Sequence, residues 1–253
     1  MEIISNVFSV PGHRGVYFRD LDLLAVSDLQ LGEERVLAEE SKIYLPEVQI
    51  KLVIEEIRKM HELTGAGRLL INGDFKHGFS GASRQEWLEV QKVYEESKAL
   101  YRDVIVVRGN HDNYLSNIST LLGFNLSDEY FEAGYKFVHG HKLTSLNGVR
   151  TLVIGHEQPA ILLRKGFDSV KMPAILYGKA VSEINFICLP ALSPISSGVA
   201  VNAIGKKELL SPYFKSVVDV DELNVIAIDP DAGEVPLPRV GILRQFLRDT
   251  TGR

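Results

Sequence analysis

Residues 103–112 read Asp-Val-Ile-Val-Val-Arg-Gly-Asn-His-Asp, an apolar run that ends abruptly in polar residues. A short β-branched run that ends at a glycine is typical of a buried strand. We therefore predict a strand over Asp103–Val107. The polar sequence Gly109-Asn110-His111-Asp112 comes directly after it and carries groups that can bind a metal ion or transfer a proton. The stretch thus predicts a functional site at the carboxyl end of a strand.

The sequence before this stretch alternates predicted strands and helices. Apolar runs predict strands at 21–27 and 68–71, and apolar residues at helical spacing predict helices at Pro46–Leu63 and from Ser83 to Tyr101. Pro46 suits a first helical turn, and Ser83 with Glu86 forms a capping-box pattern. This βαβαβ order implies parallel strands joined by right-handed crossovers.

The second half of the chain has strand-like runs without regular helices between all of them. These runs are Tyr135–Val138, Arg150–Ile154, Ile184–Leu189 and Leu223–Ile228. Asn147-Gly148 lies between the first two and is a strong signal for a hairpin turn. Parallel strands followed by antiparallel ones predict an α/β fold of two packed sheets with helices outside. We expect a loop at 206–214, and at 240–247 either an edge strand or a short terminal helix.

Length and composition narrow the class of protein. The chain has 253 residues, no internal repeat and no linker rich in Gly, Ser or Pro. We therefore expect one domain over 1–253, with the motifs in a core at about 20–200 and a C-terminal extension at about 206–253. The net charge of −5 argues against broad nucleic-acid binding, although a local basic cleft stays open. The lone Cys188 is expected in the core. Without a signal sequence or a long apolar run, we expect a cytoplasmic protein with no membrane contact.

Five predicted strands each end on a residue that can ligate a divalent cation. These residues are Asp28, Asp74, Asn110, His139 and His156. Ligands bind at the carboxyl ends of the strands in open α/β sheets, so the five side chains should converge on one crevice. Mixed oxygen and nitrogen donors suit Mn²⁺, Zn²⁺ or Fe better than Mg²⁺ or Ca²⁺. Glycines at 73, 109, 140 and 155 permit the tight turns that aim these groups.

These motifs resemble the calcineurin-like metallophosphoesterase superfamily, whose pattern runs Asp-x-His, Gly-Asp, Gly-Asn-His-Asp/Glu, His and Gly-His-x-His. The match spans about residues 22–158, and Gly109–Asp112 is complete. Gly73-Asp74-Phe75-Lys76-His77 and Leu45-Pro46 are similar to an archaeal and bacterial subgroup that includes phosphoesterases associated with DNA ligase operons. The resemblance implies a four-layer α-β-β-α sandwich with two mixed sheets.

The resemblance also implies a ligand set for two metal ions. Asp74 would bridge them, and Asn110, His139 and His156 would complete the shell of one. Two histidines expected for the other metal, which Asp28 would also hold, are replaced by Gln30 and Gln158. Glutamine oxygen is a weaker donor than imidazole. This second position could stay empty, hold a harder ion such as Mg²⁺ or Mn²⁺, or fill only with substrate. We expect one tight metal, Mn²⁺ first and Zn²⁺, Fe or Mg²⁺ as alternatives.

The implied function is hydrolysis of a phosphate mono- or diester by metal-activated water, with one metal position altered. His111 would act as general acid or oxyanion-stabilising donor, and Asp112 would orient it. Lys76, His77 and His141 are candidate contacts to the substrate phosphate, although surface or supporting roles are as well supported.

Two other functions stay open at this point. Loss of the two histidines would also fit a metal-binding scaffold or sensor with weak catalysis. A DNA nuclease ranks third, because the net negative charge does not favour it. The identity of the phosphoester substrate and the oligomeric state are not determined by the sequence. The stretch Leu189–Pro194 and Ser196-Ser197-Gly198 either reaches the cleft or forms a surface turn.

Overall fold

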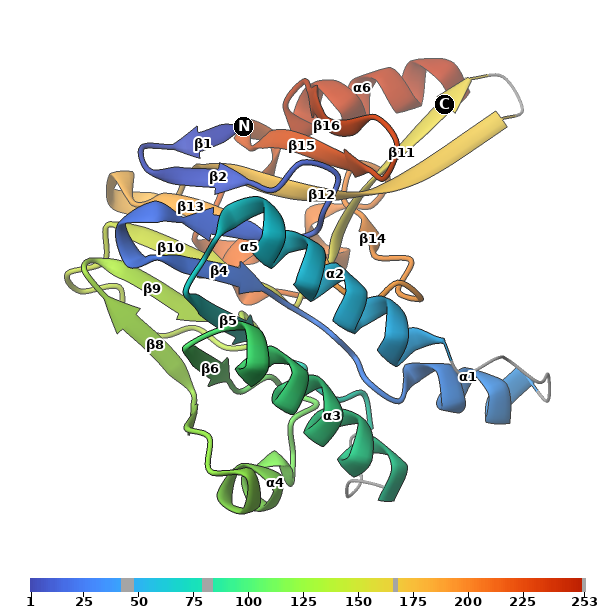
Figure 1. Cartoon of the computed structure of the whole chain (residues 1–253). Helices are drawn as coiled ribbons and strands as arrows, with labels where there is room; N and C mark the ends of the chain where they lie inside the picture. The colour runs from blue at the N-terminus through green and yellow to red at the C-terminus, as the bar shows by residue number, and fades with distance from the viewer. Residues whose placement is uncertain (42–47, 79–83, 166–167, 252–253) are drawn as a thin grey trace.

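Two β-sheets pack face to face in the computed structural model of the chain, which describes residues 1–41, 48–78, 84–165 and 168–251 (Figure 1). The first sheet has seven strands in the order β1-β2-β3-β4-β5-β6-β7. Their bounds are Glu2–Ile4, Val7–Ser9, Val16–Phe18, Leu23–Val26, Arg68–Asn72, Asp103–Val107 and Leu126–Ser127. β1 to β4 pair antiparallel and β4 to β7 pair parallel, so the sheet is mixed.

The second sheet has nine strands and is also mixed. Seven follow the order β14-β11-β12-β13-β10-β9-β8, while β15 pairs with β12 and β16 with β15. In chain order from β8 to β16, the strands are Glu129–Glu132, Tyr135–Val138, Thr151–Ile154, Pro159–Lys165, Asp168–Lys179, Asn185–Cys188, Val199–Ala200, Asn224–Asp229 and Gly233–Leu237. β9, β10 and β13 form its central parallel part.

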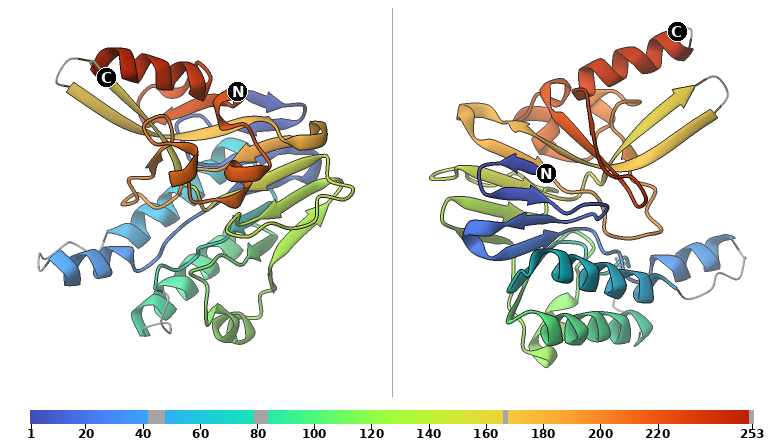
Figure 2. Two further views of the ribbon diagram at one scale, coloured as in Figure 1. Left: turned by 180° about the vertical axis from the view of Figure 1, so that it is seen from behind. Right: turned by 45° about the horizontal axis from the view of Figure 1, so that its top comes forward.

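Helices cover the outer faces of both sheets. In chain order, α1 to α6 are Glu33–Ser41, Gln49–Thr64, Arg84–Leu100, Leu115–Leu122, Pro212–Ser216 and Val240–Thr251. Short 3₁₀ turns lie at Arg19–Leu21, Val181–Glu183, Lys206–Glu208 and Val220–Glu222. α2 and α3 lie along the first sheet, and the reverse view in Figure 2 brings the C-terminal segments over the second sheet to the front. The fold is the predicted four-layer α-β-β-α sandwich. None of the described helices is long and apolar enough to cross a membrane.

Alternation along the strands builds three apolar layers between the four structural layers. In β4, Leu24 and Val26 pack with α2, while Leu23 and Ala25 lie in the layer between the two sheets. In β10, Val153 lies in this middle layer and its neighbours face the helices outside the second sheet. Successive strand residues point to opposite faces, so strands covered on both sides are apolar throughout.

The predicted core elements are present, with some shifted ends. The strands over Asp103–Val107 and Tyr135–Val138 are confirmed residue for residue as β6 and β9. α2 and α3 match the two predicted helices, while Pro46 and Ser83 lie outside the described residues, and so does the capping box. The terminal segment forms helix α6, the second of its two predicted forms.

The hairpin predicted at Asn147-Gly148 is wrong. These residues do form a turn, and Gly148 has a φ of +74°. However, the strands on either side, β9 and β10, pair parallel, so the turn lies within a crossover connection. Loop chemistry specifies a local turn, whereas pairing depends on where the sheet places the two strands. The loop expected at 206–214 was also too simple, because it contains a 3₁₀ turn and the start of α5.

Candidate metal centre

The five predicted ligands follow five neighbouring strand ends. β4, β5 and β6 are adjacent and parallel in the first sheet, as are β9 and β10 in the second. Backbone bonds from Leu192 to Ser27 and from Ser193 to Asp28 tie a segment after β13 to the end of β4. The carboxyl ends of both sheets thereby meet at one edge, where Asp28, Asp74, Asn110, His139 and His156 lie.

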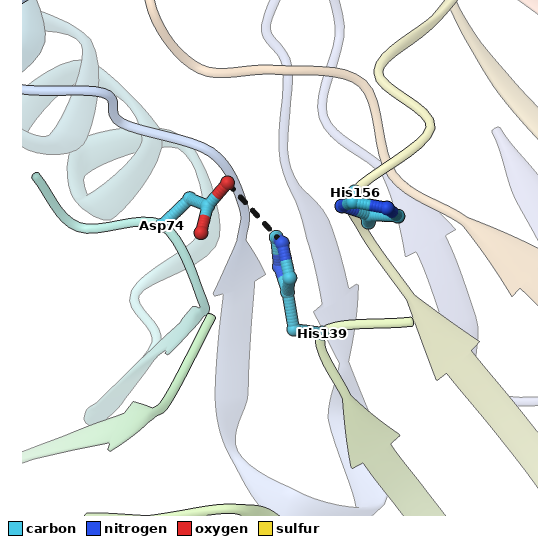
Figure 3. A group of neighbouring side chains, drawn as sticks. All are labelled: Asp74, His139 and His156. Atoms are coloured by element: carbon cyan, nitrogen blue, oxygen red, sulfur yellow. Dashed lines mark ion pairs between the residues drawn. The ribbon is translucent and has the colours of Figure 1, made fainter. Parts of the chain in front are cut away.

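Asp74, His139 and His156 form the centre of the group. Their potential ligand atoms all lie within 4.8 Å of one another (Figure 3). His139 Nε2 is 3.2 Å from Asp74 Oδ2 and 3.1 Å from Asn110 Oδ1. One carboxylate, one amide oxygen and two imidazoles therefore converge, a donor set that fits a divalent transition metal.

The His139 ring is held in the tautomer that a metal ligand needs. Its Nδ1 lies 3.1 Å from the carbonyl oxygen of Asn72, which can only accept a hydrogen bond. Nδ1 therefore carries the proton, and the neutral ring keeps its lone pair on Nε2, the atom that faces Asp74. A backbone carbonyl behind a ligating histidine is a common way to orient the ring.

The electrostatics of the group favour a cation. Burial opposes a charged carboxylate, yet His139 lowers the pKa of Asp74 to about 2. Burial is likewise outweighed at His139, where Asp74 and Asp28 raise the pKa to about 9. Burial and the neighbouring His139 lower the pKa of His156 to about 3. A proton on His139 thus occupies the place where a bound divalent ion would balance the carboxylates, and binding would release it.

Asp28 is completely buried next to this group, and both its oxygens have protein partners. Oδ2 accepts the Ser27 hydroxyl at 2.6 Å and the backbone N–H of His156 at 3.0 Å. Oδ1 accepts the side-chain amide of Gln158 at 3.1 Å. Burial raises the pKa of Asp28. The hydrogen bonds compensate part of the cost of holding a carboxylate there.

Gln30 and Gln158 occupy the positions expected for the second metal. Gln30 Nε2 donates to Asp74 Oδ2 at 2.8 Å, and its Oε1 is 2.8 Å from His77 Nδ1. Gln158 Nε2 faces Asp28, and its Oε1 accepts the Ser196 hydroxyl at 2.5 Å. The structure therefore gathers the altered residues at the centre, with their amide nitrogens toward the carboxylates. This arrangement does not fit a second metal shell.

His111 lies at the edge of the same group. Its backbone N–H donates to Asp74 Oδ1 at 2.9 Å, and its Nε2 is 3.8 Å from Asp74 Oδ2. Its Nδ1 is 2.5 Å from the carbonyl oxygen of His77, so Nδ1 carries the proton in the neutral ring and Nε2 is the atom nearest the centre.

Asp112 is buried and bonds to backbone. Its oxygens accept N–H groups from Gly109, Phe75 and Lys76 at 2.8, 2.9 and 3.3 Å. Burial and the nearby Asp74 raise its pKa to about 6. The bonds tie the loop after β6 to the loop after β5, so Asp112 positions the segments that carry Asn110 and Asp74.

The three predicted phosphate contacts differ from one another. Lys76 has no exposed surface, and its ammonium group donates to the carbonyls of Gly78 and His111. This geometry does not support a phosphate contact, because the ammonium group is hydrogen-bonded to carbonyls in the loops after β5 and β6. The His77 ring stacks on His111 with centroids 5.4 Å apart. The ring centroids of His141 and His139 lie 5.5 Å apart. The Nδ1 of His141 is buried, and the described residues provide no hydrogen-bond partner for it.

Comparison with known proteins identifies the family and agrees with the architecture. The family model for calcineurin-like phosphoesterases matches residues 21–182. The chain belongs to the calcineurin-like phosphoesterase family. The matched region contains all five predicted ligands, and membership implies use of a divalent metal. No curated protein sequence matches the chain.

Three solved structures resemble this chain to different degrees. The nuclease MPE of Pseudomonas putida is 16% identical over 90% of this chain and 93% of its own, with a TM-score of 0.61. The phosphoesterase Yfce of E. coli is 22% identical over 85% of this chain and 97% of its own, with a TM-score of 0.43. Vps29 of Chaetomium thermophilum is 12% identical, covers 85% of this chain and 92% of its own, and has a TM-score of 0.36.

The family's glycines serve the site in two ways here. Gly73 has a φ of +87°, which favours glycine, and a Cβ there would lie 2.3 Å from His139 Nδ1. At Gly109 the reason is space, since a Cβ would lie 2.1 Å from Asp74 Oδ1. The prediction that these glycines permit tight turns therefore explains only part of their role.

Supporting residues of the centre were missed by the sequence reasoning. Asn72 acts through its backbone carbonyl, which leaves no signal in the residue type. Ser27 could have been noticed because it precedes Asp28 directly. Ser196 belongs to the stretch expected either to reach the cleft or to form a surface turn, and its bond to Gln158 shows that it reaches the site.

Proposed function

We propose that the protein is a metal-dependent phosphoesterase that hydrolyses a phosphate mono- or diester, with one of the two metal positions of its family altered. The observation that carries this proposal is the convergence of Asp74, Asn110, His139 and His156 at one strand-end edge. Membership of a phosphoesterase family supports hydrolysis in general.

Asp74, Asn110, His139 and His156 would hold one divalent ion, Mn²⁺ as the first choice. Such an ion, when bound, lowers the pKa of water and neutralises charge on phosphate oxygens. The chain's own part is to orient these donors: the Asn72 carbonyl fixes the His139 ring, and the His111 backbone N–H fixes the Asp74 carboxylate.

His111 would be the general acid of the reaction. The oxygen of water forms a new bond to phosphorus and gives up a proton to solvent while the ester P–O bond breaks, and the departing oxygen takes up the proton that His111 supplies. In its protonated form the ring carries hydrogen on both nitrogens, and the hydrogen on Nε2 is the one next to the centre. The bond from Nδ1 to the His77 carbonyl keeps the ring aimed during the transfer.

A metal-binding scaffold or sensor is the competing function. The observation that favours it is the replacement of two expected histidines by Gln30 and Gln158. A nuclease is a third option, supported by the likeness of the fold to MPE, which is called a nuclease. The net charge of −5 counts against extended contact with nucleic acid.

Turnover of bis-p-nitrophenyl phosphate and p-nitrophenyl phosphate with Mn²⁺, Mg²⁺ or Zn²⁺ tests these options. We expect hydrolysis in the wild type and a loss of about 100-fold or more in His111→Ala, with metal content retained. Absence of turnover in fully metal-loaded protein would favour the scaffold. Loss of metal in His111→Ala would show that His111 acts as a ligand. Cleavage of single- or double-stranded DNA, with no cleavage of the small esters, would favour the nuclease.

A further inference from the structure

The orientation of the two glutamine amides follows from the chemistry of their neighbours. An ionised carboxylate has only acceptor atoms, so the amide atom that faces it must be the NH₂ group. Gln30 faces Asp74 at 2.8 Å, and Gln158 faces Asp28 at 3.1 Å. The NH₂ groups therefore point at the same carboxylates that a second cation would need. An amide nitrogen in this form offers no lone pair to a metal.

The amide oxygens are held on the opposite side. Gln30 Oε1 lies 2.8 Å from His77 Nδ1, and Gln158 Oε1 accepts the Ser196 hydroxyl at 2.5 Å. These oxygens are the only atoms of the two side chains that could ligate a hard cation. Turning either amide to ligate would break its bond to the carboxylate and would require His77 Nδ1 or the Ser196 hydroxyl to accept a hydrogen bond instead of donating one.

The backbone keeps both glutamines in place. Gln30 and Gln158 adopt left-handed conformations with φ of 51° and 49°. The Gln30 N–H donates to the carbonyl of Asp74, and the Gln158 carbonyl accepts from Val199. Each residue is thus anchored through main chain and side chain together, and the left-handed backbone fixes the direction in which the amide leaves it.

We propose that the amides of Gln30 and Gln158 take the place of the second metal ion, so that the centre binds a single divalent cation between Asp74, Asn110, His139 and His156. The two N–H···carboxylate bonds stabilise the negative charge of Asp28 and Asp74, which a second cation would otherwise balance. This inference deepens the proposed function, and its consequence for substrates rests on that function. The predicted number of bound metal ions is independent of the proposed function.

The consequence concerns the charge of the substrate. Asp28 and Asp74 contribute two negative charges, and one divalent cation balances them. The ammonium group of Lys76 is occupied by two backbone carbonyls. A centre with one cation therefore offers less positive charge to a phosphate than a centre with two. Absence of the second cation therefore costs a phosphodiester, which carries one negative charge, less stabilisation than a phosphomonoester, which carries two. The glutamines would thus bias the protein toward diesters.

Metal counting tests the proposal directly. Chelator-treated protein is dialysed against Mn²⁺, and bound metal per chain is measured by mass spectrometry. We expect one equivalent in the wild type and two in the double variant Gln30→His and Gln158→His. Gln91→His, on the surface of α3, controls for Mn²⁺ bound by an added histidine and should retain one equivalent. Two equivalents in the wild type would overturn the proposal whether or not the double variant folds.

Substrate preference tests the consequence. The measured quantity is the ratio of kcat/KM for bis-p-nitrophenyl phosphate to kcat/KM for p-nitrophenyl phosphate. Uptake of a second Mn²⁺ by the double variant should lower this ratio about tenfold or more, since one further divalent charge favours the dianion. An unchanged ratio with two bound ions would overturn the charge argument. Absence of all hydrolysis in the wild type would refute the proposed function, while a count of one equivalent would still support the amide replacement.

Discussion

The two proposed metal positions share Asp74 and lie on neighbouring strand ends, yet they are built differently. At the first, His139 Nε2 lies 3.2 Å from Asp74 Oδ2 and 3.1 Å from Asn110 Oδ1, two acceptor oxygens that would face a cation once the proton on His139 is released. At the second, the carboxylate of Asp28 meets an amide NH₂ at 3.1 Å. The contacts at the first position can open to admit a cation, whereas those at the second already satisfy the carboxylates.

The backbone does not account for this difference. Asp28, Gln30, Asp74, His156 and Gln158 all adopt left-handed conformations, with φ between 49° and 63°. The same strained turns serve both positions. The backbone therefore directs side chains toward both metal positions. The terminal amides of Gln30 and Gln158 decide which of the two positions can bind a metal.

The largest effect that would sharpen the comparison is expected in His139→Ala. Loss of a ligand that is also hydrogen-bonded to Asn72 should empty the first position and remove several kcal/mol of transition-state stabilisation. Turnover should fall about a thousandfold, and metal content should fall with it. His13→Ala, a histidine whose ring is bonded to Glu56 and which is none of the predicted ligands, is the matched control and should retain both. Full metal content in His139→Ala would break the assignment.

Replacing each carboxylate by its amide tests the two positions against each other. Asp74→Asn should abolish metal binding, because it removes the anionic ligand of the first position. Asp28→Asn should keep one equivalent of metal, with a loss of about 1 kcal/mol in the free energy of unfolding from weakened hydrogen bonds. Bound metal by mass spectrometry and denaturant unfolding measure both. A similar loss of metal in the two variants would show that the two positions are equivalent.

Gly109→Ala should disturb the first metal position by steric overlap, without removing any ligand. The added methyl would lie 2.1 Å from Asp74 Oδ1 and 2.3 Å from the Asp74 backbone nitrogen, so both the carboxylate and the loop that carries it must move. Metal affinity should weaken about 10- to 100-fold, as when the surroundings of a ligand are disturbed. Gly205→Ala is the control, since its Cβ meets only the Glu208 carboxylate, at 3.1 Å. Calorimetric titration with Mn²⁺ distinguishes them, and equal affinities would show that the loop adapts.

The smallest effect is expected in Ser27→Ala. The Ser27 hydroxyl donates to Asp28 Oδ2 at 2.6 Å inside the core. Its loss should lower the free energy of unfolding by about 1 kcal/mol and leave metal affinity unchanged, because Asp28 is not a ligand of the first position. Denaturant unfolding and Mn²⁺ titration measure the two quantities. A clear fall in Mn²⁺ affinity would indicate that Asp28 holds a metal after all.

Much of this protein was predictable because its signals are local. The β-branched run at 104–107 indicated a buried strand, and parallel pairing places the polar residues after β4, β5 and β6 at one edge of the first sheet and those after β9 and β10 at one edge of the second. The replacement of histidine at Gln30 and Gln158 was also visible from residue types.

Other features depended on contacts between distant segments. The Asn147-Gly148 turn has hairpin chemistry, but the parallel pairing of β9 and β10 is set by the sheet around them. The lysine at 76 looks like a phosphate contact, yet it is buried against the carbonyls of Gly78 and His111. Asp112 follows His111 in sequence, yet its oxygens accept backbone N–H groups from Gly109 in its own loop and from Phe75 in the loop after β5.

The sequence by itself determined the strands that carry the site, the residues at their ends and the loss of two histidines, because periodicity and residue type are properties of short segments. Only the tertiary structure decided which way the amides of Gln30 and Gln158 point. That direction depends on His77, Ser196 and two buried carboxylates brought in from other segments. A side-chain amide is both donor and acceptor, so its role at a metal centre is set by the partners that the fold places around it.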